Sequence, residues 1–269
     1  MDRQLARLRK ILADLKSTLV AFSGGVDSSF LLAVALDELG DRAVALTFRS
    51  CLVPRREIER AAVFCRQRHA RHIIVDVDPL QHEQIRLNPP ERCYHCKYQL
   101  FALALTKAAE LGIDNVIEGS QLSDKSDHRP GRRALAELGI RSPLAEAGFD
   151  KESVRHFSRE LGLPSWNLPP MACLASRIPY GHLLDCDTLS RVEKAEEFLF
   201  DHGFTLVRVR DFNGAARLEL LPEELGMVVD TSFRERLLAK FKKLGYTNVS
   251  LDLEGYRTGK LNLEIRPFP

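Results

Sequence analysis

Short apolar runs alternate with longer amphipathic segments through the first half of the chain. The runs that predict β-strands are 19–22, 43–48, 73–77 and 115–118, and the segments that predict helices are 2–16, 23–39 with its leading loop, 54–69 and 93–111. Strands that alternate with helices of ten or more residues imply right-handed crossovers and a parallel sheet covered on both faces. We therefore expect a doubly wound α/β fold in the N-terminal part.

The pattern changes in 164–181. This stretch, PSWNLPPMACLASRIPYG, contains four prolines and one glycine and follows neither a helical nor a strand period, so it is interpreted as a structured loop. Beyond it, helices are expected at 186–202 and 230–243 and strands at 204–210, 216–221 and 247–253. We expect an N-terminal domain over 1–165, a cysteine-bearing loop over 166–185 and a small α+β domain over 186–269.

Composition narrows the class of protein. The 269 residues carry 39 Lys plus Arg against 37 Asp plus Glu, a net charge of +2, so no global field would hold a polyanion and nucleic acid is not an expected partner. No apolar run is long enough to span a bilayer, and the N-terminus lacks the apolar stretch of a secretory signal. In the cytoplasm that these features predict, the six cysteines are not expected to form disulfides.

A glycine-rich loop between the first strand and the next helix is the strongest motif. It reads Ser23-Gly24-Gly25-Val26-Asp27-Ser28-Ser29. A glycine pair lets several N–H groups turn toward one point, and the helix adds its positive end, which suits an anion such as pyrophosphate. The loop is neither GxxxxGK[ST] nor GxGxxG. The alternative is a glycine turn with a Ser/Asp helix cap.

The string SGGVDSS resembles the signature of the PP-loop ATP pyrophosphatases, which split ATP between the α- and β-phosphates and adenylate an oxygen of the substrate. The resemblance implies that the pyrophosphate part is held by Ser23, Gly24, Gly25, Ser28 and Ser29. It also implies that Asp27 caps the helix or helps to place Mg²⁺. Whether nitrogen or sulfur then replaces AMP is left open by this signature.

Three of the cysteines stand in segments typical of sites. Cys93 and Cys96 form a C-x-x-C near a predicted helix start, a pattern that fits a redox pair, half of a zinc site or part of an iron–sulfur site. Cys173 lies in the irregular segment, so the three thiols can hold three corners of a [4Fe–4S] cluster and leave one iron for hydrosulfide. A Zn²⁺ site completed by another cysteine or a histidine is the alternative. Cys51, Cys65 and Cys186 are interpreted as packing or incidental thiols.

Over 1–220 the chain also resembles the LarE family of ATP-dependent sulfur transferases. Three segments carry the match, namely IEGSQLSDKSDHRPGRRAL at 117–135, RSPLAEAG at 141–148 and WNLPPMACLASRIPYG at 166–181. Gly119 and Asp124 would then lie at the ATP end. Ser120, Gln121, Ser123 and His128 depart from the family pattern there.

The LarE resemblance implies an activity. Family members adenylate a carboxylate of pyridinium-3,5-dicarboxylate mononucleotide and convert it to a thiocarboxylate, an intermediate of the nickel-pincer nucleotide cofactor. Some use one sacrificial cysteine at the position of Cys173, whereas others carry two more cysteines and a [4Fe–4S] cluster. Because Cys93 and Cys96 are present, the cluster type is expected, and the family also implies a homo-oligomer.

Arginines near the loop suit a small anionic nucleotide. Arg177 and Ser176 follow Cys173, while Arg208 and Arg210 lie two apart on a predicted strand and so share one face. A solvated basic strand face is the alternative. Three other functions remain open, namely a tRNA thiolase, an ammonia-using amide-forming enzyme and a zinc-stabilised nucleotide-binding regulator.

Overall fold

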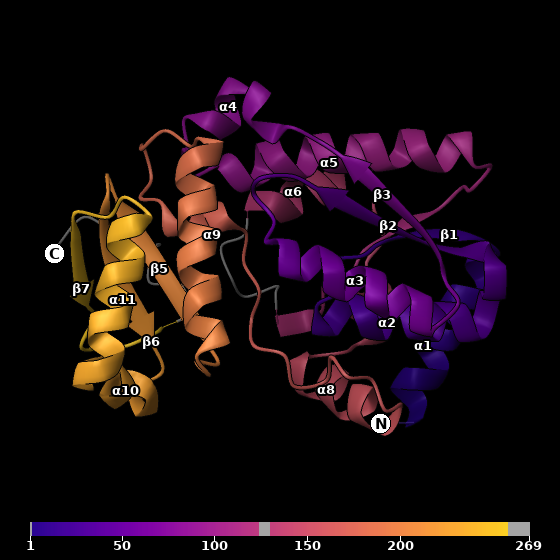
Figure 1. Cartoon of the computed structure of the whole chain (residues 1–269). Helices are drawn as coiled ribbons and strands as arrows, with labels where there is room; N and C mark the ends of the chain where they lie inside the picture. The colour runs from indigo at the N-terminus through magenta and orange to yellow at the C-terminus, as the bar shows by residue number, and fades with distance from the viewer. Residues whose placement is uncertain (1, 124–129, 258–269) are drawn as a thin grey trace, which may run out of the picture. The chain divides into compact units, whose positions relative to one another are not determined.

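The computed structural model describes residues 2–123 and 130–257, and the chain divides into two compact units (Figure 1). The first unit comprises Met1–Asp78 and Glu91–Met171, and the second comprises Pro79–Pro90 and Ala172–Pro269. The short segment 79–90 therefore lies within the predicted N-terminal domain by sequence but groups with the second unit.

A four-stranded parallel sheet forms the centre of the first unit. Its strands are β1 (Thr18–Ala21), β2 (Ala43–Arg49), β3 (Arg71–Asp76) and β4 (Val116–Ile117), in the order β3-β2-β1-β4. Every neighbouring pair is parallel. Together with the helices between its strands, this sheet confirms the predicted α/β fold.

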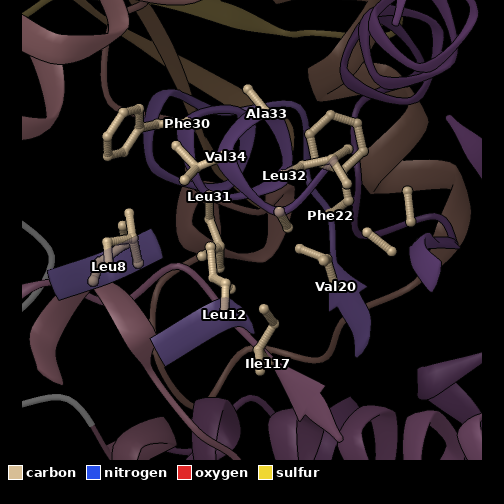
Figure 2. Packing of buried hydrophobic residues seen from close by; sticks show 14 of the residues in the cluster. Leu8, Leu12, Val20, Phe22, Phe30, Leu31, Leu32, Ala33, Val34 and Ile117 are labelled. Carbon is tan, nitrogen blue, oxygen red and sulfur yellow. The ribbon is translucent and has the colours of Figure 1, made fainter. Parts of the chain in front are cut away.

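Consecutive residues of β1 and β2 belong to two different apolar clusters. In β1, Leu19 joins one apolar cluster and Val20 another, and in β2 the same holds for Val44 and Ala45. Since successive strand side chains point to opposite faces, the two clusters lie on the two faces of the sheet. Figure 2 shows part of the larger cluster, where Leu8 and Leu12 of the first helix lie with Phe30 and Leu31 of the second.

Seven α-helices of the described residues belong to the first unit. They are α1 (Asp2–Leu15), α2 (Val26–Leu39), α3 (Arg55–Gln67), α5 (Arg92–Glu110), α6 (Pro130–Glu137), α7 (Pro143–Ala147) and α8 (Lys151–Glu160). The helices α7 and α8 were not expected from the sequence. In α8, the Asp150 carboxylate accepts from the Ser153 N–H at 2.8 Å, and Val154 and Phe157 are buried in the larger core.

The second unit has its own sheet and core. Strands β5 (Val207–Phe212) and β6 (Ala215–Leu220) pair antiparallel, and β7 (Asn248–Leu251) joins β6 in parallel. Its helices are α4 (Glu83–Arg86), α9 (Cys186–Asp201), α10 (Leu225–Val229) and α11 (Thr231–Lys243). Residues of α9 and α11 pack with the strands in one apolar cluster, as expected for a small α+β unit.

Within the described residues, no helix is both long and apolar enough to cross a membrane.

Candidate functional site

The phosphate loop begins next to Phe22, whose backbone N–H and C=O are both hydrogen-bonded to residues of β2. Phe22, the residue after β1, donates its N–H to Leu46 O at 2.8 Å, and Thr47 Oγ1 donates to Phe22 O at 2.7 Å. Because the single hydroxyl proton of Thr47 is used in this way, His72 Nε2 is the donor in its 2.8 Å contact with Thr47 Oγ1. Burial lowers the pKa of His72 and so favours the neutral ring in this role.

Ser28 closes the loop into a ring. Its Oγ accepts from the Ser23 N–H at 3.3 Å, lies 3.1 Å from Ser23 Oγ and donates to Gly25 O at 3.2 Å. Gly25 is the N-cap of α2 and offers no side-chain cap. The amides at the start of α2 therefore face the loop with the positive end of the helix, which is the arrangement that binds phosphate groups.

Two glycines let other elements approach this loop closely. Gly24 has φ +73°, and a Cβ there would lie 3.2–3.3 Å from the backbone of Ala61 in α3. A Cβ on Gly119, just after β4, would lie 3.0 Å from Ser28 N. The structure thus brings together Gly24 and Gly119, both predicted as part of the ATP site, around the start of α2.

An ion pair that the sequence analysis missed lies beside the loop. Lys151 Nζ, in the first residue of α8, is 2.6 Å from Asp27 Oδ2. Asp27 Oδ1 is buried without a hydrogen-bond partner among the described residues. Asp27 thus does not cap α2 through a side-chain hydrogen bond. Its carboxylate lies at the loop, and one of its oxygens has no hydrogen-bond partner among the described residues.

The turn after β4 is shaped by a buried acid. Glu118 is buried and accepts from Ser120 N at 3.0 Å, Ser120 Oγ at 2.8 Å and Ser142 Oγ at 2.5 Å. This acid fixes the position of Gly119 and was not predicted as a site residue. Asp124, which was, lies outside the described residues.

Cys93 and Cys96 share the first two turns of α5. Residues three apart on a helix lie on one face. Arg92 Nη2 donates to Cys93 Sγ at 3.7 Å. No group of three or more His, Cys, Asp or Glu side chains suited to a metal ion is found in the parts of the chain that the structure describes.

Cys173 belongs to the second unit, where it caps the short 3₁₀ helix Leu174–Arg177. Ser176 donates both its N–H and its Oγ to Cys173 O, at 3.0 and 2.8 Å. The remaining thiols differ in exposure. Burial raises the pKa of Cys65 to about 12, whereas Cys51 is half-buried and Cys186 is exposed. Cys65 is therefore a packing residue, as expected.

Two of the predicted substrate arginines hold this cysteine-bearing segment. Arg177 forms a two-point ion pair with Glu196 of α9, at 2.9 and 2.8 Å, and donates to Ala172 O at 2.6 Å and Cys173 O at 3.0 Å. Arg210 pairs in the same way with Glu219, at 3.0 and 2.8 Å, and donates to Ser176 O. Their charges are thus neutralised within the second unit while they fix the backbone of 172–176.

Arg208 is placed differently. It is 6% exposed and donates to Val207 O at 2.7 Å, and its guanidinium lies 5.3 Å from the centre of the Tyr256 ring. Burial, followed by the nearby charge of Arg177, lowers the pKa of Arg208. Because Arg208 and Arg210 are both buried, the alternative of a solvated basic strand face is wrong.

Comparisons with known proteins show which proteins this chain is similar to. The family model of queuosine biosynthesis protein QueC matches residues 17–86, which include the phosphate loop. An uncharacterised protein of Synechocystis sp. is 40% identical over 262 residues, 97% of this chain and 98% of that protein. The pyridinium-3,5-bisthiocarboxylic acid mononucleotide synthase of Lactiplantibacillus plantarum is 37% identical over 258 residues, 96% and 93% of the two chains. A tRNA sulfurtransferase of Desulfurococcus amylolyticus is 29% identical over 159 residues, 54% of this chain and 32% of that one.

Proposed function

Because the chain belongs to the LarE family of ATP-dependent sulfur transferases, we propose that its substrate is pyridinium-3,5-dicarboxylate mononucleotide. A substrate carboxylate oxygen attacks the α-phosphorus of ATP, pyrophosphate leaves, and a mixed acyl-phosphate anhydride with AMP forms. A sulfur nucleophile then attacks the acyl carbon, AMP leaves and a thiocarboxylate remains. The product is an intermediate of the nickel-pincer nucleotide cofactor.

The phosphate loop is the observation that carries this proposal. The Ser23–Gly25–Ser28 ring and the uncapped start of α2 fit the pyrophosphate part of ATP. Loop N–H groups stabilise the negative charge that gathers on the leaving pyrophosphate. Asp27 Oδ1, which is buried and without a partner among the described residues, fits a ligand of the Mg²⁺ that accompanies ATP. Ser29 Oγ is likewise buried without a described partner in the same turn.

The buried arginines suit the anionic substrate. The guanidinium of Arg208 is buried on β5, and we assign a phosphate or carboxylate group of the substrate to it because its forked donors suit such groups. Arg177 and Arg210 act indirectly by holding Ser176 and Cys173 in place. Charge removal at Arg208 should therefore raise the KM for the mononucleotide, whereas the KM for ATP should not change.

For the sulfur source we propose a [4Fe–4S] cluster held by Cys93, Cys96 and Cys173. The donor set fits such a cluster in part, since Cys93 and Cys96 share one helix face and Arg92 donates a hydrogen bond to Cys93 Sγ. When bound, the cluster would supply one iron without a protein ligand that can carry hydrosulfide. The protein's own contribution is to place Cys93 and Cys96 on one helix face and to hold the backbone of Cys173 through Ser176 and Arg177.

The function is tested by pyrophosphate release. Purified protein is given Mg²⁺-ATP with and without the dicarboxylate mononucleotide, and the products are analysed by mass spectrometry. We expect pyrophosphate to depend on the mononucleotide and, once sulfide is supplied, the product mass to rise by the difference between sulfur and oxygen. Sulfur incorporation into tRNA instead would establish the thiolase, and ATP binding without cleavage would establish the regulator.

The sulfur carrier is tested separately. After anaerobic purification and reconstitution, iron and acid-labile sulfide are measured in the unmodified protein, in Cys173→Ser and in the control Cys186→Ser. We expect stoichiometric cluster in the unmodified protein and the control, and loss of cluster in Cys173→Ser. Zinc in place of iron would contradict the proposal, and dehydroalanine at Cys173 after turnover would show that this thiol is sacrificed.

A further inference from the structure

The phosphate loop contains no basic residue. Between Ser23 and Ser29 its only charged side chain is Asp27, and Lys151 lies 2.6 Å from that carboxylate. These two charges cancel, so the loop and its ion pair contribute no net positive charge toward ATP. The β- and γ-phosphates carry most of the negative charge of ATP, and binding them calls for a cation beyond Mg²⁺.

Arg60 of α3 is placed to be that cation. Its neighbour Ala61 packs against Gly24. The backbone N and Cα of Ala61 lie 3.2 and 3.3 Å from the position that a Cβ on Gly24 would take. Arg60 itself is half-buried, and Nη1 donates to the thioether sulfur of Met171 at 3.0 Å. The terminal Cε of Met171 in turn lies 3.1 Å from the position of a Cβ on Gly25. The end of the Met171 side chain thus lies between the guanidinium of Arg60 and Gly25, the second glycine of the loop.

The contact between Arg60 and Met171 is easily exchanged. A thioether sulfur is a weak hydrogen-bond acceptor, whereas a phosphate oxygen accepts a charge-assisted and often two-point bond from arginine. Methionine is unbranched and has three rotatable side-chain bonds, so its end can leave the loop without moving the backbone. Its departure opens space between Gly25 and Arg60 for a phosphate group.

We propose that Arg60 binds the pyrophosphate part of ATP after displacing Met171 from the phosphate loop. The inference rests on the proposed use of this loop for ATP and adds a positioning cation from α3. Arg60 also binds the pyrophosphate product, so it contributes to the leaving-group step. AMP, which lacks the β- and γ-phosphates, makes no contact with Arg60.

The test compares magnesium pyrophosphate with AMP by isothermal titration calorimetry. Loss of a charged hydrogen bond predicts that Arg60→Gln binds magnesium pyrophosphate about 10- to 100-fold more weakly. Its affinity for AMP should stay within about twofold of the unmodified protein. Arg60→Lys, which keeps the charge, should recover part of the loss. Arg66→Gln, an exposed arginine on the same helix, is the matched control and should change neither affinity.

Met171→Leu gives a second, independent outcome. Leucine keeps the apolar volume but removes the sulfur acceptor, so magnesium pyrophosphate should bind at least as tightly as in the unmodified protein. The proposal is overturned if Arg60→Gln weakens pyrophosphate and AMP equally, if it weakens neither, or if Met171→Leu loses as much affinity as Arg60→Gln. Failure of the unmodified protein to bind magnesium pyrophosphate would instead overturn the proposed ATP site.

Discussion

Removing Glu196 should destabilise the second unit while leaving the first unit folded. Glu196 accepts two bonds from Arg177 and a third, at 2.9 Å, from the Val209 N–H, and the side chains of the ion pair are 5% and 3% exposed. Glu196→Ala leaves a buried guanidinium and a buried N–H without these partners. Breaking such a pair lowers the free energy of unfolding by about 3–5 kcal/mol.

Urea unfolding measures this loss. With an m-value of about 2 kcal/mol per molar urea, a loss of about 4 kcal/mol moves the midpoint down by about 2 M. Trp166, the sole tryptophan of the chain, lies in the first unit, so its fluorescence reports on that unit, whereas far-UV circular dichroism reports on both. We expect an early transition in the dichroism that the fluorescence does not follow.

Two further variants test whether the loss of stability in Glu196→Ala comes from a buried charge left without its partner. Glu235→Ala removes an exposed acid of α11 in the same unit and should leave the midpoint nearly unchanged. The double variant Arg177→Leu with Glu196→Leu should be more stable than Glu196→Ala, because no buried charge is left without a partner. A midpoint shift in Glu196→Ala no larger than in Glu235→Ala, or a double variant that is the least stable of the set, would contradict a buried ion pair that stabilises this unit.

Three further predictions follow from the geometry. Gly24→Ala should abolish measurable Mg²⁺-ATP binding in calorimetry, because alanine is strained at φ +73° and its Cβ meets the Ala61 backbone; Gly40→Ala, at φ +56° in open space, should bind normally. Lys151→Met should lower the free energy of unfolding in urea by less than about 1 kcal/mol, since the side chains of the ion pair are 39% and 27% exposed, and a larger loss would contradict this assignment. Because burial raises the pKa of Cys65 from 9.0 to about 12, iodoacetamide at pH 8 should alkylate exposed Cys186 first and Cys65 last, as read by peptide mass spectrometry. For the same reason Cys65 contributes stability below pH 9 that is lost between about pH 9 and 12, as the unfolded thiol ionises first.

The elements set by local patterns were predicted well. The apolar runs of β1 and β2 and the glycine pair before α2 are signals within a few residues, and the parallel sheet and phosphate loop follow from them. Helix α8 was missed although its signals are present, since Asp150 is an N-cap three residues before Ser153.

The partners in the ion pairs could not be predicted from the sequence. Arg177 and Glu196 are 19 residues apart and Asp27 and Lys151 are 124 apart, and no periodicity links either pair. The sequence placed Arg177 and Arg210 among the substrate ligands because of their charge. Only the fold shows that buried glutamates already neutralise both.

The segment 79–90 has a consequence for how the protein is made. Asn88 is fully buried, donates to Ile178 O and Pro179 O, and accepts from Gly181, across a sequence separation of about 90 residues. During synthesis this segment leaves the ribosome long before its partners exist, so the second unit cannot complete its packing until the chain beyond 184 is made. A fragment that ends at 171 would carry 79–90 without the partners that Asn88 has at Ile178, Pro179 and Gly181, and a single cut in the gene does not separate the two units.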